Sequence, residues 1–188
     1  MIATSINTPE YWNMEWDRRL FQFHSVFSVI SATCPPGSNV LDMGCGSGLL
    51  MSLLSIYKEC VCVGIDLSQS AADRFNDKVS NCRIIPCSIE FAPDILDREF
   101  FDVVMMVEVL EHLEEPKKAL KIAHSLLKEG GVGYFSVPDD CLGPEEEPEH
   151  LRKYTRLEFR DLVRSVFPKE GAGKMVSVDH RILAQVHK

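Results

Sequence analysis

The chain has 188 residues, of which 45% are hydrophobic and 26% charged, a composition that is typical of a globular protein and excludes disordered, collagenous and fibrous classes. The formal charge of −8 disfavours nucleic-acid and anionic-membrane partners, because their phosphates would be repelled. The length predicts one domain, no apolar run approaches the ~20 residues that span a bilayer, and the N-terminus lacks the basic and apolar regions of an export signal.

The N-terminal quarter predicts a helix followed by a strand, a turn and a second helix. Aromatic and aliphatic residues recur at helical spacing from Trp12 through Ile30, and residues 35–37 (PPG) end that helix. Residues 39–43 (NVLDM) predict a short buried strand that runs directly into the glycine-rich turn GCGSG. Residues 49–57 continue as an apolar helix.

Strands and helices alternate through the middle of the chain. Near-continuous apolar strands separated by helices indicate a parallel sheet that is covered on both faces. Strands are predicted at 60–65, 82–86, 101–107 and 132–137, and helices from the N-cap Ser68 to about Ser80 and at 117–127, with Gly130 and Gly131 closing the second helix.

The C-terminal part departs from this alternation. Thr155 is the predicted N-cap of a helix over 156–167, and KMVSVDH and RILAQVHK follow with almost no residues between them. Two strands joined by so tight a turn must be antiparallel. The acidic segment 144–150 (PEEEPEH) predicts an exposed loop. We therefore expect a single domain, 1–188, with an N-terminal helical lid over 1–35 and a core over 38–188.

The strongest functional signal is the sequence VLDMGCGSGLL. Gly44, Gly46 and Gly48 follow a strand and open a helix, which lets the backbone approach a ligand where a Cβ would collide. Leu49 stands where the dinucleotide fingerprint needs its third glycine, and the acid Asp42 would repel a pyrophosphate but suit a cationic ligand. Asp66 ends the second strand, at the distance where a carboxylate reaches ribose hydroxyls.

At these residues the chain resembles the class I S-adenosylmethionine-dependent methyltransferases. VLDMGCGSG, GIDLS, FDVVMMVEVLEHL and LLKEGGVGYFSVP resemble four motifs of that family in order, and EVLEHLEEP resembles the ubiquinone-biosynthesis O-methyltransferases. The resemblance implies an α/β, Rossmann-like fold: a seven-stranded, mostly parallel sheet with an antiparallel C-terminal hairpin and helices on both faces.

The resemblance also implies a set of cofactor contacts. Gly44, Cys45 and Gly46 would line the methionine end of S-adenosylmethionine, Asp66 its ribose and Leu67 its adenine. Where many relatives place an acid against the adenine amino group this chain has Ser88, a weaker acceptor, beside the apolar Ile89. The expected cofactor-binding residues are Asp42, Gly44, Cys45, Gly46, Gly48, Asp66, Leu67, Ser88, Ile89 and Val107.

The segment EVLEH supplies the candidate catalytic groups at the carboxyl edge of the sheet. Spacings of three and four residues would place Glu108, Glu111 and His112 on one face of a helical turn. Three interpretations stay open. The trio could be structural, His112 could be the general base, or all three could bind a divalent cation such as Mg²⁺, as similar ExxEH arrangements do in ubiquinone-pathway and small-RNA 3'-end methyltransferases. His112 and Glu108 are the candidate catalytic residues.

Several other side chains are candidates for the walls of this site. Tyr11 and Trp12 are candidate lid residues, whereas the spacing of Trp16 equally suits core packing. His150 and Tyr154 could reach the site from the far wall or belong to a surface loop. The simplest interpretation of Met105 and Met106 is that both are core residues.

These patterns predict a methyltransferase that modifies an oxygen, or else a nitrogen, of a small-molecule acceptor. Metal-dependent 2'-O-methylation of an RNA terminus and a non-catalytic cofactor-binding subunit are the alternatives. The seven cysteines show no zinc or disulfide spacing, which favours free thiols in a reducing cytoplasm. We expect a monomer or homodimer with no nucleic-acid or membrane partner.

Overall fold

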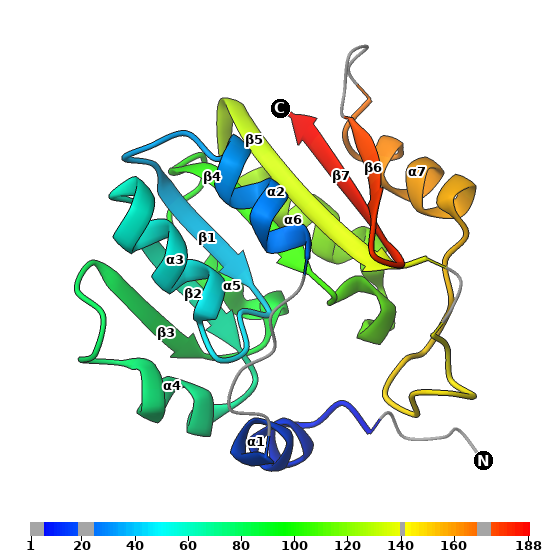
Figure 1. Ribbon diagram of the computed structural model, residues 1–188, viewed down its shortest axis with the longest axis horizontal. Coiled ribbons are helices and arrows are strands. Elements are labelled where there is room, and N and C mark those ends of the chain that lie inside the picture. The colour runs from blue at the N-terminus through cyan, green and yellow to red at the C-terminus, as the bar shows by residue number, and fades with distance from the viewer. Residues whose placement is uncertain (1–5, 19–24, 140–141, 169–173) are drawn as a thin grey trace.

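A computed structural model describes residues 6–18, 25–139, 142–168 and 174–188 and contains a seven-stranded sheet (Figure 1). The strands lie in the order β3-β2-β1-β4-β5-β7-β6. Within this described sheet β7 is antiparallel to both β5 and β6 and the other pairs are parallel, which confirms the predicted fold. The strands are β1 (Asn39–Met43), β2 (Val61–Asp66), β3 (Cys82–Pro86), β4 (Phe101–Val107), β5 (Leu127–Pro138), β6 (Met175–Val178) and β7 (Arg181–His187).

Helices cover both faces of the sheet. Alternate strand residues feed two apolar layers, because successive side chains of a strand point to opposite faces. Val40 and Met105 pack with α2, α3 and α4, whereas Leu41 and Met106 pack with α5, α6 and α7. Both methionines are therefore core residues, as predicted. The helices are α1 (Pro9–Arg18), α2 (Val26–Thr33), α3 (Leu49–Lys58), α4 (Gln69–Phe75), α5 (Ala92–Ile95), α6 (Pro116–Leu126) and α7 (Arg156–Arg164), with 3-10 turns η1 (Ile89–Phe91) and η2 (Leu110–His112).

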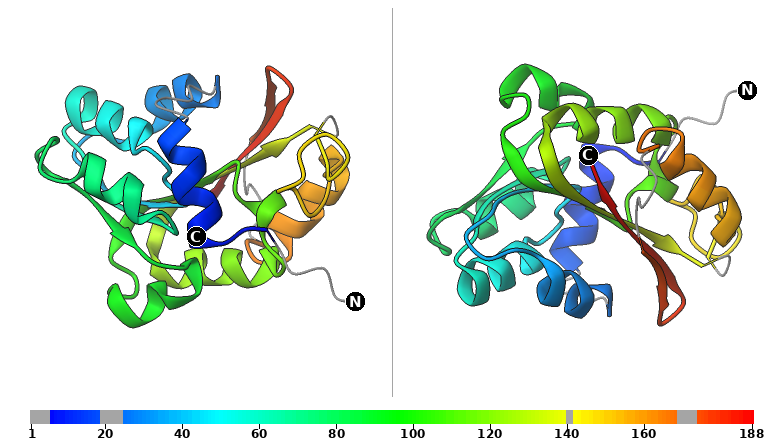
Figure 2. Two further views of the ribbon diagram at one scale, coloured as in Figure 1. Left: turned by 90° about the horizontal axis from the view of Figure 1, so that it is seen from below. Right: turned by 90° about the horizontal axis from the view of Figure 1, so that it is seen from above.

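The single helix predicted from Trp12 through Ile30 is wrong, because α1 and α2 are separate helices in different places (Figure 1). The residues between them, 19–24, lie outside the described residues. Helix α2 buries Val26, Phe27 and Ile30 against the sheet. Helix α1 instead crosses the edge toward which the arrowheads of β1, β2 and β3 point (Figures 1 and 2). Continuous apolar spacing could not reveal that the two halves pack against different partners.

The predicted start of the fifth strand is also wrong. Gly130 and Gly131 do not close α6, whose C-cap is Leu127 in an extended conformation. Both glycines belong to β5, where pairing with β4 shifts register between Phe101 and Val103. The positive φ of Gly130, 77°, suits glycine at this irregularity. Helix α4 likewise ends at Phe75 rather than near Ser80. No helix within the described residues is long and apolar enough to cross a membrane.

Thr155 caps α7 as predicted, and its loss should destabilise the protein. Its side chain accepts a hydrogen bond from the Glu158 backbone N–H, and the Glu158 side chain accepts one from the backbone of Thr155, which completes a capping box. We expect Thr155→Ala to lower the free energy of unfolding by ~1 kcal/mol, measured by urea denaturation. Thr155→Ser keeps the hydroxyl and is the matched control. Equal stability of both variants would show that the cap contributes nothing.

Candidate active site

Two adjoining cavities open at the carboxyl edge of the sheet, beneath α1. The larger is about 300 Å³ and the smaller about 130 Å³. Both are lined by Trp12, Trp16, Gly44, Glu108 and His112. The two cavities therefore share a wall that includes the first glycine of the turn between β1 and α3.

The glycine-rich turn between β1 and α3 is held by Asp66. The Gly46 backbone N–H donates to Asp66 Oδ2 at 2.8 Å, and the Ser68 N–H donates to Oδ1 at 2.9 Å. Gly46 has a φ of 52°, and a Cβ added there would collide with the Trp16 ring. Gly48 is the N-cap of α3, packs against Phe75 and lines neither described cavity. The sequence predicted that the turn and Asp66 lie together, but it did not predict the hydrogen bonds that join them.

Two buried carboxyl groups lie beside this turn. Asp66 lines the larger cavity and Asp42 the smaller one. Burial, with a smaller contribution from the Asp66 charge, raises the pKa of Asp42 from 3.8 to about 8. Burial also raises the pKa of Asp66, opposed by the backbone N–H groups of Ser68 and Gly46. A cation bound beside Asp42 would favour its ionised form.

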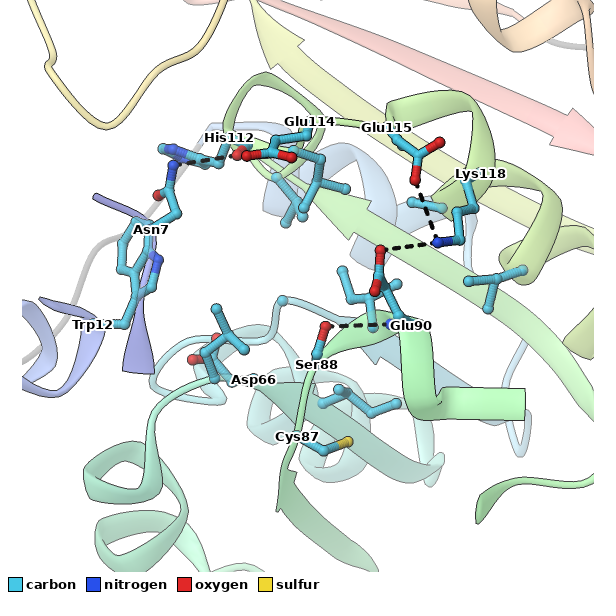
Figure 3. Close-up of a pocket in the computed structure, with 18 of the residues that line it drawn as sticks. Asn7, Trp12, Asp66, Cys87, Ser88, Glu90, His112, Glu114, Glu115 and Lys118 are labelled. Carbon is cyan, nitrogen blue, oxygen red and sulfur yellow. Dashed lines mark hydrogen bonds and ion pairs between the residues drawn. The ribbon is translucent and has the colours of Figure 1, made fainter. Parts of the chain in front are cut away.

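The far wall of the larger cavity follows β2 and β3. Leu67, Ser88 and Ile89 line it, as the sequence predicts for an adenine site. In Figure 3, Asp66 and Ser88 lie on one side of the opening and Trp12 and His112 on another. The remaining predicted cofactor residues, Cys45 and Val107, line the smaller cavity. Apart from Gly48, the predicted cofactor residues therefore meet around the two cavities.

Glu108 does not share a helical face with Glu111 and His112, so that part of the sequence interpretation is wrong. Its φ is 57°, and it precedes the short turn η2. Its carboxylate accepts a hydrogen bond from Ser136 Oγ at 2.9 Å and pairs with Arg181 Nε at 3.1 Å. Burial raises the pKa of Glu108, and the Arg181 charge opposes this. Ser136 of β5 and Arg181 of β7 are thus the partners that hold the Glu108 carboxylate.

A different trio comes together: Glu111, His112 and His150. Each offers a ligand atom, and these atoms lie within 4.8 Å of one another. Glu111 is 1% exposed, and neither carboxylate oxygen has a hydrogen-bond partner among the described residues. Burial, and next the Glu108 charge, raise the pKa of Glu111 well above its usual range. A buried carboxyl group without partners is costly, and the donor atoms of this cluster are of the kinds that bind divalent cations.

The two histidines are oriented through their Nδ1 atoms. His112 Nδ1 lies 3.0 Å from the Glu149 carbonyl, and His150 Nδ1 lies 3.1 Å from the Leu142 carbonyl. Because a carbonyl only accepts, each neutral ring carries its proton on Nδ1 and keeps the lone pair on Nε2. This arrangement is common among histidines that bind metal ions.

The segment that brings in His150 is fastened to η2. The Leu151 N–H donates to the Glu111 carbonyl at 2.8 Å, and Asn7 Nδ2 donates to the carbonyls of His112 and Glu149 at 3.2 and 2.9 Å. Glu149 and His150 are buried, so the prediction of an exposed loop is wrong at its C-terminal end. The signal available in the sequence was His150, four residues before Tyr154. Its position in the site depends on the hydrogen bonds between its segment and η2.

Helix α1 lays its two tryptophans over the cavities. The Trp12 ring packs edge-on against His112, with centroids 5.1 Å apart, and His112 packs against His150 at 4.7 Å. Tyr11 packs against Trp12 rather than lining either described cavity. Trp16 lies on Gly46 and lines both cavities. The aromatic residue that covers the glycine turn is therefore Trp16.

Comparisons with known proteins identify the family of the chain. A family model described as a methyltransferase domain matches residues 14–176. The ubiquinone biosynthesis O-methyltransferase of Coxiella burnetii is 34% identical over 105 residues, which cover 54% of this chain and 44% of that protein. The chain therefore matches less than half the length of that curated relative.

Two solved structures share the fold. A chain of the complex of the Haloferax volcanii Trm112 methyltransferase activator superimposes with a TM-score of 0.78 at 14% identity, covering 98% of this chain and 97% of that one. Burkholderia thailandensis 1,6-didemethyltoxoflavin-N1-methyltransferase, solved with its named acceptor and S-adenosylhomocysteine, gives a TM-score of 0.67 at 18% identity, covering 100% and 93%.

Proposed function

This chain belongs to the class I S-adenosylmethionine-dependent methyltransferases, and on that premise we propose that it methylates a hydroxyl group of a small molecule, assisted by a divalent cation. The observation that carries the proposal is the buried Glu111 carboxyl group beside His112 and His150, which has no hydrogen-bond partner in the described part of the chain and lies next to a cavity with the family's glycine turn. The similarity to O-methyltransferases of ubiquinone biosynthesis supports the choice of oxygen.

The larger cavity would hold the adenosine part of the cofactor. Asp66 would accept hydrogen bonds from the ribose hydroxyls, and Leu67, Ser88 and Ile89 would contact the adenine. S-adenosylmethionine supplies the methyl group from a sulfonium centre that is already activated. The work left to the protein is alignment of the acceptor, exclusion of water and removal of a proton. Trp12 and Trp16 cover the cavities and would exclude water from them.

The smaller cavity would hold the reacting hydroxyl of the acceptor together with the amino-acid tail of the cofactor. Glu111, His112 and His150 would bind the cation through one carboxylate and two imidazole nitrogens, a donor set that suits a hard or borderline divalent ion. Such an ion supplies Lewis acidity, which lowers the proton affinity of an acceptor hydroxyl. Glu108, held by Arg181 and Ser136, lies outside this donor set and would shape the cavity wall. If no cation is used, His112 is the group placed to take the proton.

Calorimetric titration with S-adenosylhomocysteine, followed by methyl transfer from radiolabelled S-adenosylmethionine, tests the proposal. We expect micromolar binding, and turnover on a panel of small phenols and catechols rather than on short RNA. The smaller cavity is only about 130 Å³ and the net charge is −8, which disfavours RNA. Methylation of RNA ends alone would replace this proposal by the RNA alternative. Binding without turnover would indicate a cofactor-binding subunit.

A further inference from the structure

The indole N–H of Trp16 is buried and has no acceptor among the described residues. Its ring lies on Gly46, where an added Cβ would collide with it, and lines both cavities. Native structures rarely leave a buried donor unpaired, because the lost hydrogen bond to water is not replaced. Because the Trp16 ring lines both cavities, a ligand acceptor atom beside this ring could satisfy the unpaired donor.

The residues that line each cavity indicate which part of a ligand would lie beside Trp16. Asp66 lines the larger cavity, Asp42 and Gly46 line the smaller one, and Gly44 lines both. A cofactor whose ribose lies at Asp66 must extend its amino-acid tail past Gly44 and under Trp16. That tail carries an ammonium and a carboxylate. The buried carboxyl group of Asp42 suits the ammonium, and the carboxylate needs a hydrogen-bond donor.

The other strong donors on these walls are already paired. Lys118 Nζ contacts carboxylate oxygens of Glu90 and Glu115 at 3.1 and 3.3 Å, at the adenine end of the larger cavity (Figure 3). Arg181, on the smaller cavity, pairs with Glu108. Among the described lining residues these are the lysine and arginine side chains. The lysine and arginine side chains of these walls are thus already paired, whereas the Trp16 N–H beside the turn has no described acceptor.

Trp16 is also held in place from the far side. The Arg74 guanidinium donates to the Trp16 carbonyl. One turn earlier in α1, Asn13 Oδ1 accepts hydrogen bonds from Ser68 Oγ at 2.9 Å and from the Ser70 N–H at 3.0 Å. These bonds tie α1 to the start of α4, directly after Asp66. The donor is therefore fixed relative to the ribose site.

We propose that the Trp16 indole N–H donates a hydrogen bond to the α-carboxylate of the cofactor, which makes Trp16 a positioning residue for the amino-acid tail. The inference rests on the proposed function. Its distinguishing consequence is that Trp16 recognises S-adenosylhomocysteine, which has the tail, and not 5'-methylthioadenosine, which keeps the adenosine and sulfur but lacks the amino acid.

Trp16→Phe keeps an aromatic ring over Gly46 and removes the N–H. By calorimetry we expect its affinity for S-adenosylhomocysteine to fall by ~10-fold or more, since the lost bond is charge-assisted, while its affinity for 5'-methylthioadenosine changes less than about 2-fold. Trp12→Phe, which alters the other tryptophan of the lid, is the matched control and should leave the ratio of the two affinities unchanged.

The NMR signals of the indole N–H groups provide a second measurement. A role of Trp16 in packing alone would not change them. The chain has two tryptophans, so the ¹⁵N-correlated spectrum has two indole N–H signals, and Trp16→Phe assigns them. We expect the Trp16 signal to move downfield with S-adenosylhomocysteine and not with 5'-methylthioadenosine. If Trp16→Phe lost equal affinity for both ligands, or if the Trp16 signal did not shift in the bound protein, only the role of Trp16 would be overturned. Wild-type protein that binds neither ligand would overturn the proposed function, and this inference with it.

Discussion

Removal of divalent cations with EDTA should abolish methyl transfer, and Mg²⁺ or Mn²⁺ should restore it. The expectation follows from the cluster of Glu111, His112 and His150, whose ligand atoms lie within 4.8 Å of one another, and from the lack of any described partner for the Glu111 oxygens. Glu111→Gln should raise the cation concentration needed for half-maximal activity by ~10-fold or more, because loss of even an outer partner costs that much.

The same variant should leave cofactor binding nearly unchanged, since Glu111 belongs to the cluster with His112 and His150 and not to the residues assigned to the cofactor. His150→Ala should resemble Glu111→Gln, whereas His187→Ala, which removes an exposed histidine at the end of β7, is the control. A crystal soaked in Mn²⁺ should show an anomalous peak between Glu111, His112 and His150. Its absence, together with turnover that survives chelation, would contradict the cation site.

In that event His112 remains the candidate base. Chelation would then have no effect, and His112→Ala would slow turnover by the ~10²–10⁴-fold expected for a lost general base. If neither chelation nor these substitutions mattered, the cluster would be structural, and catalysis would rest on proximity.

Asp66→Ala should weaken binding of S-adenosylhomocysteine by roughly 10- to 100-fold, because hydrogen bonds to a charged acceptor contribute ~1.5–3 kcal/mol. Calorimetric titration measures this. Asp73→Ala is the control, since Asp73 is an exposed aspartate on α4 that contacts Gln69. An affinity that matches the wild type would remove Asp66 from the site.

Because Asp66 also holds the N–H groups of Gly46 and Ser68, its loss could act by loosening the turn. A second ligand separates the two causes. Wild-type protein should prefer 5'-methylthioadenosine over its 2',3'-dideoxy analogue, and Asp66→Ala should remove that preference if the carboxylate contacts the ribose. A preference that persists in the variant would assign Asp66 a purely structural role.

The local sequence pattern was sufficient to predict most strands of the sheet. The predicted bounds of β1, β3 and β4 agree with the structure, because each strand is a short, mostly apolar run that ends at turn residues. The glycine turn and Asp66 could be placed together from sequence, since the carboxyl ends of neighbouring parallel strands share one edge of the sheet. Thr155 and Ser68 were recognisable as caps because capping is a contact between residues a few positions apart.

What the sequence could not determine depended on contacts between residues distant along the chain. The separation of α1 from α2, the early start of β5 and the pairing of Glu108 with Arg181 all depend on such partners. So does the cation cluster, in which His150 joins Glu111 and His112 only because its segment is hydrogen-bonded to η2. Periodicity reports which side of an element is buried, whereas the identity of the partner is decided by the packing of the whole chain.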